Sequence, residues 1–351
     1  MKNNKEKIAI VIVNWNGWGD TIECLQSIYN QDSFEAPIIV IDNSSTDGSA
    51  EKITHWANYL ICAVAENKFF NPIVNLRSNK EQYIFNSINN INHIEPNLNF
   101  SINDSSLILL NLNENIGFAG ANNIGITLLK NNGYKSIWFI NNDTVIEKNC
   151  FNVVKKVIQD NGDKFIIFGN SLLEYWQPDK IQAIGGKYNL YTGTSSHIDC
   201  GKTWVHESNI NLKHIDYPIG AGMIVNIEYF NKFGLMSTDY FLYYEEIDLL
   251  IRSGWPSNAF CIVNSIIYHK GGKSTKGNSN LLKRSLISDY YMIRGRIIFS
   301  NKLPILKNLI TKILLIVTLV KRLKSKKHFK NCLVAIIDGI RGIRGRKNII
   351  D

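Results

Sequence analysis

Short apolar runs alternate with polar loops along most of the chain. Four runs in the first half are rich in branched or aromatic side chains: Lys7–Val13, Pro37–Ile41, Leu107–Leu112 and Ile137–Ile140. Such runs are typical of strands buried on both faces of a sheet, although one as short as Ile137–Ile140 could also belong to a core helix. Segments with helical spacing follow the loops. This repeated order of strand, loop and helix predicts an α/β fold with a mostly parallel central sheet flanked by helices.

The second half of the chain has a less regular pattern. Residues 172–213 carry scattered Gly, Tyr and Trp and predict only loops and short strands. Three further strands are predicted at Lys164–Gly169, Met223–Ile227 and Cys261–Tyr268, and helices at Asn122–Lys130, Phe151–Gln159 and from Glu246 onward.

Residues 66–106 differ in character from the segments around them. They are crowded with Asn and Ser, show no clear period, and contain Pro72 and Pro96. We interpret this stretch as an insertion or long surface excursion within the main domain, with room for short strands of its own. On one hypothesis it shapes the acceptor side or a partner contact; on the other it is a passive surface loop.

Acidic side chains and one histidine gather where apolar segments end. They are Asp42, Asp143, Glu245, Glu246, Asp248 and His269. Parallel strands end on one edge of a sheet, and open α/β sheets bind ligands at that edge. Each residue also has a structural explanation: Asp42 as a helix cap, Glu245 and Glu246 as a solvated helical turn, His269 as a hydrogen-bonded residue, and Asp248 as a partner of Arg252.

The charge of the chain is concentrated at one end. The net charge is +9, but residues 301–351 contain 13 Lys or Arg and two Asp or Glu, so they carry +11 and the remaining chain −2. A near-neutral main domain argues against nucleic acid as a partner and favours one local anionic partner for the tail. Six dispersed cysteines without a CxxC pair predict reduced thiols in a cytosolic protein without a zinc site. We find no export signal and no uncharged run of about 20 residues.

The tail, residues 301–351, combines an apolar helix face with basic clusters. Apolar residues recur at three- and four-residue spacing from Leu306 to Val320, and Lys307 and Lys312 interrupt the run. A basic cluster follows at residues 321–330. This composition predicts an amphipathic helical anchor on an anionic membrane surface, and the alternative is a helix packed on the domain formed by residues 1–300.

Seven blocks, in a fixed order, carry a family resemblance. They are Ile10–Gly17, Val40–Ser49, Asn115–Gly125, Phe139–Val145, Gly220–Met223, Tyr240–Arg252 and Ser265–Thr275. Their order and spacing resemble the inverting family 2 glycosyltransferases of the GT-A fold, specifically the bacterial rhamnosyltransferase-like branch. The resemblance covers roughly residues 7–275, except for the Asn-rich segment.

The resemblance implies a nucleotide-sugar donor, a divalent metal (Mg²⁺ or Mn²⁺) and a hydroxyl acceptor. It places Asp143 and His269 at metal-binding positions and Glu246 at the position of the catalytic base. Glu245 is the alternative base, and Glu245 and Asp248 are expected on the acceptor side. The implied donor-binding residues are Asn14, Asp42, Asn115, Gly117, Asn141 and Asn142, with Asp42 at the nucleotide base.

Inverting sugar transfer is a chemistry that these residue types suit. It is an in-line displacement at the anomeric carbon, so a carboxylate must take the acceptor proton. The departing nucleoside diphosphate needs neutralisation, which a divalent cation supplies.

The chain departs from the family pattern at three places. Asn141-Asn142-Asp143 offers the metal one carboxylate instead of two, Glu245-Glu246 replaces the commoner Glu-Asp, and Ser237-Thr238 replaces Asp-Glu. With fewer anionic ligands, metal binding without donor should be weaker.

We therefore expect an inverting glycosyltransferase of bacterial cell-surface polysaccharide synthesis. The branch implies dTDP-rhamnose as donor and a glycan or lipid-linked acceptor, at the inner face of the plasma membrane. A nucleotidyltransferase is the alternative enzyme, although the loop after the first strand lacks Lys and Arg. A non-catalytic nucleotide-sugar or glycan-binding scaffold is the alternative without chemistry.

Overall fold

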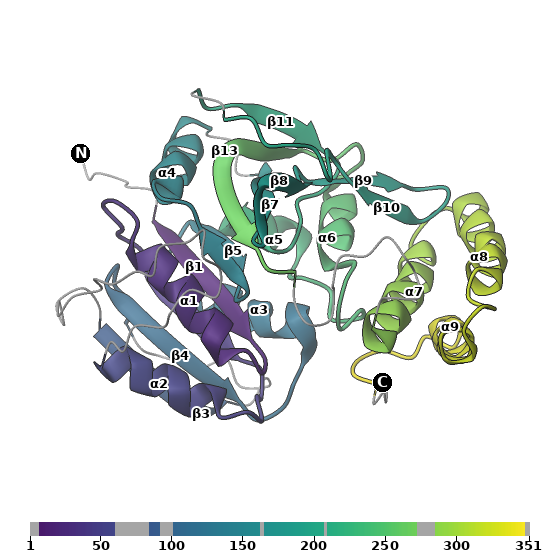
Figure 1. The fold of residues 1–351 in the computed structure, drawn as a ribbon, viewed down its shortest axis with the longest axis horizontal. Helices are drawn as coiled ribbons and strands as arrows, with labels where there is room; N and C mark the ends of the chain where they lie inside the picture. The colour runs from purple at the N-terminus through teal and green to yellow at the C-terminus, as the bar shows by residue number, and fades with distance from the viewer. Residues whose placement is uncertain are drawn as a thin grey trace.

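One central sheet runs through the molecule (Figure 1). The computed structural model describes residues 7–59, 84–91, 101–161, 165–206, 209–271 and 285–347. Within these residues the strand order is β11-β13-β7-β12-β5-β1-β2-β4-β3, with β6 paired to β13 and β8 to β7, and β9 and β10 form a separate pair. The strands are β1 (Ile8–Asn14), β2 (Ile38–Asp42), β3 (Ile84–Ile91), β4 (Ser106–Leu112), β5 (Ser136–Asn141), β6 (Thr144–Ile146), β7 (Ile167–Glu174), β8 (Gln177–Ala183), β9 (Gly186–Asn189), β10 (Thr194–His197), β11 (Leu212–Ile215), β12 (Gly222–Asn226) and β13 (Ala259–His269).

The predicted mostly parallel sheet is confirmed. Strands β5, β1, β2, β4 and β3 run parallel, and β12 lies antiparallel between β5 and β7. The chain leaves β1 toward β2 and β4 on one side, whereas β5 pairs with β1 on the other. This reversal of direction marks the place where open α/β sheets bind ligands, at the carboxyl ends of β1 and β5.

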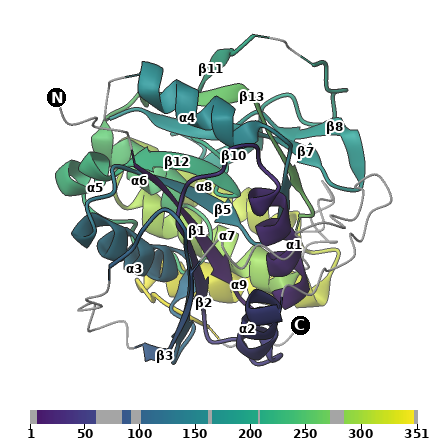
Figure 2. The ribbon, with the colours of Figure 1, turned by 90° about the vertical axis from the view of Figure 1, so that its left-hand side faces the viewer.

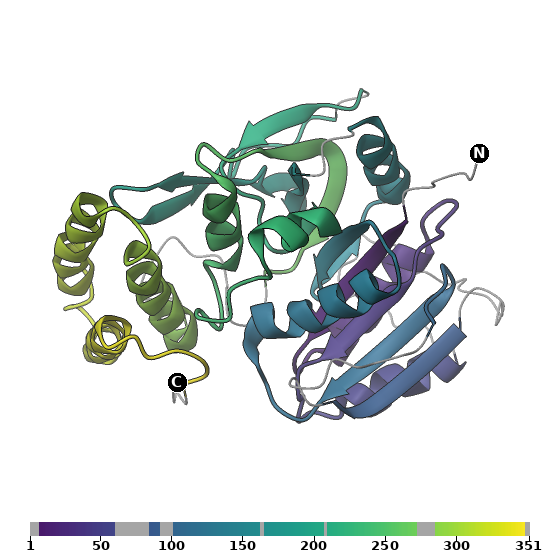
Figure 3. The same ribbon diagram turned by 180° about the vertical axis from the view of Figure 1, so that it is seen from behind.

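Helices cover both faces of the sheet. The helices are α1 (Trp18–Tyr29), α2 (Ser49–Tyr59), α3 (Gly117–Asn131), α4 (Cys150–Asp160), α5 (Ile227–Phe233), α6 (Glu245–Ser253), α7 (Leu286–Ser300), α8 (Ile305–Val320) and α9 (Lys326–Ile340). Apolar side chains of α1, α2 and α4 pack on one face, and those of α3, α5 and α6 on the other. Figure 2 shows α1 and α2 across the sheet from α3 and α5, and Figure 3 shows the molecule from behind.

Residues 84–91 of the 66–106 segment belong to the sheet. Residues 84–91 form β3, which pairs in parallel with β4 and ends the strand order there. Its Asn- and Ser-rich sequence suits an edge strand, because polar edges resist pairing with other chains. Residues 66–83 and 92–100, which carry Pro72 and Pro96, lie outside the described residues.

The last three helices form a cluster of their own. Tyr290, Ile297, Leu315, Cys332 and neighbouring side chains of α7, α8 and α9 make a separate small core. The predicted domain boundary at residues 300 and 301 falls between α7 and α8, inside this cluster, and it stays a prediction. The cluster is joined to the main body where the Tyr291 ring stacks on Phe241, with 4.9 Å between centroids.

Candidate active site

The carboxyl ends of β1 and β2 meet through two side chains. Asn14 and Asp42 are paired in register, and Asn14 Nδ2 donates to Asp42 Oδ2 at 2.7 Å. The other Asp42 oxygen accepts from the backbone N–H of Ser45 at 2.9 Å. Both side chains are buried, so Asp42 is an oriented acceptor in the β2 loop. Asp42 is therefore not at the start of the next helix, as a helix cap would be. Helix α2 begins at Ser49, whose N–H donates to the Asp47 side chain at 3.0 Å.

Asn142 joins the β5 end to this pair. Its Nδ2 donates to Asn14 Oδ1 at 3.1 Å, and Thr21 Oγ1 donates to the same oxygen at 2.8 Å. Asn141 ends β5 in register with Val13. The predicted donor-binding residues Asn14, Asp42, Asn141 and Asn142 are thus adjacent at one edge of the sheet.

Asn43 connects the β2 loop to the start of α3. Its side chain donates to Asn115 Oδ1 at 3.1 Å and accepts from the N–H of Ile116 at 3.0 Å. Asn115 Oδ1 also accepts from the N–H of Gly117 at 3.0 Å. The helix therefore begins at Gly117, five residues before the predicted start, because these amide contacts shape the loop into its first turn.

Gly117 has both a special backbone and a close neighbour. Its φ is +80°, and a Cβ there would lie 2.6 Å from the carbonyl oxygen of Phe241. Phe241 O also accepts from the N–H of Phe118 at 3.0 Å. Only glycine fits this contact, which ties the α3 loop to the aromatic loop before α6.

Gly117→Ala should therefore destabilise the protein more than an alanine at a glycine with the same backbone and open space. Gly133 has φ +74° and nothing within 4 Å of its Cβ position, so Gly133→Ala should lower the free energy of unfolding by about 1 kcal/mol from backbone strain alone. Gly117→Ala should lower it by about 3 kcal/mol or more, because Phe241 must move as well. Urea denaturation of both variants measures the difference. Equal losses would show that the contact with Phe241 is unimportant.

Asp143 and His269 face each other beyond the β5 end. His269 Nε2 lies 3.3 Å from Asp143 Oδ1, and the backbone N–H of Lys270 donates to Asp143 O at 2.9 Å. On the other side of the ring, Nδ1 lies 2.6 Å from Gln182 Oε1. Burial lowers the pKa of His269, but the Asp143 carboxylate and, more weakly, Glu174 outweigh it, and the pKa is raised.

This pair fits part of a divalent-metal site. One carboxylate oxygen and one imidazole nitrogen lie near the same point, and a metal-binding histidine commonly has its other ring nitrogen held by an oxygen acceptor, as Gln182 does here. Within the described residues, however, no group of three or more His, Cys, Asp or Glu side chains could hold a metal. Asp143 and His269 would therefore supply only part of a ligand set.

Glu245 and Glu246 begin α6 in different environments. The preceding residues Phe241, Tyr243 and Tyr244 all have positive φ, a tight path that turns the chain into the helix. Glu245 is buried, and its Oε1 has no hydrogen-bond partner among the described residues. Burial and then the charge of Glu246 raise the pKa of Glu245 well above its usual range. This excludes a solvated turn at Glu245.

Glu246 is less buried and reaches the β12 side of the site. A Cβ on Gly220 would collide with the Glu246 carboxylate, so the glycine makes room for it. Burial raises the pKa of Glu246, and hydrogen bonds from the backbone at Glu246 and Gly220 offset part of that rise. Gly222, two residues on, pairs with Ile140 near the end of β5. Glu246 therefore lies near the carboxyl end of β5, which Asn141 terminates.

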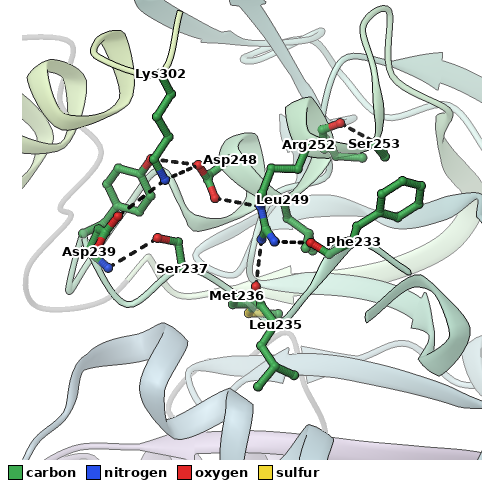
Figure 4. Close-up of polar contacts among 12 residues, drawn as sticks. Phe233, Leu235, Met236, Ser237, Asp239, Asp248, Leu249, Arg252, Ser253 and Lys302 are labelled. Atoms are coloured by element: carbon green, nitrogen blue, oxygen red, sulfur yellow. Dashed lines mark hydrogen bonds and ion pairs between the residues drawn. The ribbon is translucent and has the colours of Figure 1, made fainter. Parts of the chain in front are cut away.

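Asp248 is buried and lies at the centre of a cluster of ion pairs (Figure 4). Oδ1 accepts from Tyr240 Oη at 3.0 Å and Lys302 Nζ at 2.7 Å, and Oδ2 accepts from Arg252 Nε at 3.0 Å. Arg252 also donates to the carbonyl of Leu235 at 2.8 Å. The structural explanation of Asp248 as a partner of Arg252 is therefore confirmed. Its place on the acceptor side, like that of Glu245, stays a prediction.

Residues 341–347 bring the basic end of the chain back to this region. Buried Arg294 of α7 donates to Gly345 O at 2.9 Å, and Arg344 pairs with Asp239 at 2.9 Å. Arg346 then lies over the ring of Trp15, with its Cζ 5.8 Å from the ring centroid. Since Trp15 follows Asn14 directly, this return segment reaches the loop at the carboxyl end of β1.

Comparison with known families gives a match over the first part of the chain. Residues 9–81 match the family described as "Glycosyl transferase family 2". The match covers the loops after β1 and β2 and continues into the segment expected to be an insertion. No curated protein sequence matches the chain.

Solved structures show a likeness in fold. GalNAc-T7 with UDP, GalNAc and Mn²⁺ superposes with a TM-score of 0.52 at 12% identity, over 98% of this chain and 59% of that one. A mannosyltransferase, PcManGT from Pyrobaculum calidifontis with GDP-Man and Mn²⁺, gives 0.49 at 11% identity over 97% and 76%. TarS 1-349 from S. aureus with UDP-GlcNAc gives 0.46 at 11% over 95% and 81%. The first of these agrees with the predicted GT-A-like fold.

Proposed function

Since residues 9–81 match glycosyl transferase family 2 and the fold is GT-A-like, we propose that this protein is a nucleotide-sugar-dependent glycosyltransferase. The observation that carries the proposal is the set of side chains at one sheet edge. Asn14, Asp42 and Asn142 form a hydrogen-bonded group, and Asp143 faces His269 beside them. Transfer from a nucleotide sugar needs such an edge, with polar groups for the nucleotide and a carboxylate for a metal.

Each residue then has a role that its surroundings support. Asp42, held by Asn14 and Ser45, would accept from the nucleotide base, and the loop from Asn115 to Gly117 would contact the donor. Asp143 and His269 would hold Mg²⁺ or Mn²⁺. The ion, when bound, would supply positive charge for the departing diphosphate, whose oxygens would complete the ligand set that these two residues leave open.

Glu246 is the proposed catalytic base. It is more accessible than Glu245, and its raised pKa suits a group that must take a proton from an acceptor hydroxyl. Glu245 is more deeply buried, and burial raises its pKa well above its usual range. An acceptor hydroxyl therefore reaches Glu246 more readily than Glu245.

The sequence resemblance supports a more specific proposal for the donor and the acceptor. We propose dTDP-rhamnose as donor and a hydroxyl of a glycan or lipid-linked acceptor, in bacterial cell-surface polysaccharide synthesis. A lipid-linked acceptor would bring this cytoplasmic enzyme to the inner face of the plasma membrane. Two alternatives differ in their products: a nucleotidyltransferase would release diphosphate, and a binding scaffold would release nothing.

A panel of nucleotide sugars tests the donor. With Mn²⁺ present, dTDP-rhamnose should raise the melting temperature more than UDP-, GDP- or other dTDP-sugars, because a ligand that binds only the folded state stabilises it by about 2.7 kcal/mol at 100 times its Kd. The same panel with EDTA is the control. A larger shift with another sugar would contradict the rhamnose assignment alone. If no donor shifts the melting temperature and none is hydrolysed, the transferase proposal itself fails.

A further inference from the structure

Helix α8 presents its apolar side chains to solvent. Leu309, Ile313 and Ile316 are 54%, 55% and 64% exposed, and Leu306, Val317 and Val320 on the same stripe are exposed as well. We call these six residues the α8 outer face. They recur at helical spacing, so they form one continuous stripe. A stripe of this kind on a helix at the periphery of the molecule (Figure 1) marks an interaction site.

The side of α8 that faces the protein is unusually polar. Thr311 Oγ1 donates to the carbonyl of Tyr191 at 3.2 Å, and Thr318 Oγ1 accepts from Arg296 at 3.1 Å. Just after the helix, Arg322 is buried against Asp289 of α7, with Nε 2.7 Å from Oδ2. Among the apolar side chains of α8, the described structure buries only Leu315 fully, in the small core formed by α7, α8 and α9. The helix thus meets the protein through polar contacts together with Leu315 and Leu319, and it presents further apolar residues to solvent.

The charges around the outer face identify what could cover it. Residues 303–337 contain eight Lys or Arg and no Asp or Glu. Arg322 is used in the buried pair, whereas Lys321, Lys324, Lys326, Lys327 and Lys330 are exposed. A second copy of this face would bring like charges together, whereas a surface of anionic lipid would attract them.

The length of the helix decides how it would meet a bilayer. Sixteen residues of α-helix extend about 24 Å, less than the hydrocarbon thickness of about 30 Å. In the part of the chain that the structure describes, no helix has both the length and the hydropathy to cross a membrane. An apolar stripe beside lysines on a helix too short to span is the composition of a helix that lies in the interface.

We infer that the α8 outer face docks onto an anionic membrane surface, with α8 in the plane of the interface and the lysines after it at the lipid headgroups. The inference does not rest on the proposed transferase activity, because it concerns a surface remote from the sheet edge. Membrane binding can therefore be measured without donor, metal or acceptor.

The structure argues for point substitutions in place of truncation. Removing residues 301–351 would take Arg322 from Asp289 and Asp338 from Tyr290, whose hydroxyl donates to it at 2.6 Å, and would leave buried polar groups of α7 unpaired. The test variant is therefore Ile313→Glu with Ile316→Glu in the full chain. Its control is Val205→Glu, an exposed apolar residue (74%) in the segment between β10 and β11, which adds negative charge away from α8.

Co-sedimentation with vesicles of phosphatidylcholine and phosphatidylglycerol at low salt is the measurement. The unmodified chain should bind them, bind phosphatidylcholine alone at least about tenfold more weakly, and lose binding as salt increases. The double variant should lose at least about tenfold in vesicle binding while it unfolds at the same temperature as the unmodified chain. Val205→Glu should bind vesicles normally.

Three outcomes would overturn the inference. They are absence of vesicle binding by the unmodified chain, equal binding by the double variant, and equal loss in Val205→Glu. A lipid-free dimer that the double variant abolishes, without an effect on vesicle binding, would identify a second copy as the occupant. If vesicle binding is confirmed and no nucleotide sugar is hydrolysed, the membrane surface stands and the transferase proposal fails.

Discussion

Asp143→Ala is expected to abolish sugar transfer at ordinary Mg²⁺ or Mn²⁺ concentrations. Asp143 is the only carboxylate in the Asn141-Asn142-Asp143 turn, and it faces His269 at 3.3 Å. Without it, the proposed cation would lose the carboxylate among its two proposed ligands, and several kcal/mol of charge stabilisation at the departing diphosphate would be lost. We expect turnover to fall by about 10³-fold or more, as measured by release of nucleoside diphosphate in the presence of acceptor.

Two further variants separate a role in metal binding from general damage. His269→Ala should raise the metal concentration needed for half-maximal activity and weaken donor binding. Asp32→Ala removes an exposed carboxylate that pairs only loosely with Lys148, at 3.7 Å, and should leave activity unchanged. Wild-type activity of Asp143→Ala in the presence of EDTA would disprove the metal-dependent mechanism.

Glu246→Gln is expected to lower kcat by about 10²-fold or more with little change in donor affinity. Glutamine keeps the shape of the side chain beside Gly220 but cannot accept the proton of the acceptor hydroxyl. Because the pKa of Glu246 is raised, activity of the unmodified enzyme should increase with pH through a midpoint above the usual glutamate value of about 4.3. This acid limb should be missing in Glu246→Gln.

Glu245→Gln is the matched control for this substitution. Glu245 is buried and its pKa is raised well above its usual range, so burial favours the neutral form, which glutamine resembles. Activity should remain close to normal. Near-normal turnover in Glu246→Gln together with a large loss in Glu245→Gln would reverse the two roles.

The sequence predicts the sheet and its polar edge because burial leaves a clear signature. Runs such as Ile137–Ile140 are apolar on both faces, and the polar residues that end them must lie at one edge of a parallel sheet. The same logic predicts that the loops carrying Asn14, Asp42 and Asn142 lie together at this edge. Their hydrogen bonds confirm the adjacency, whereas their contacts with a donor stay predictions.

Other features depend on tertiary contacts that no local pattern encodes. Gln182, which orients His269, comes from β8 within a stretch that predicted only loops and short strands, and no spacing rule connects the two residues. Asp248 has the same sequence context whether it faces an acceptor or pairs with Arg252 and Lys302. The periodicity of α8 revealed an apolar stripe but could not show which side of the helix faces the protein.

Residues 341–347 connect the loop at the carboxyl end of β1 with the C-terminal helices, so these parts form one connected unit. Arg346 lies over the Trp15 ring, and Gly345 is held by Arg294 of α7, which also donates to the carbonyl of Tyr240 at 2.8 Å. If docking of α8 shifts this unit and changes donor affinity by some factor, thermodynamic linkage requires donor to change the affinity for the lipid surface by the same factor. Occupancy of the nucleotide site would then change the fraction of the protein that is bound to the membrane.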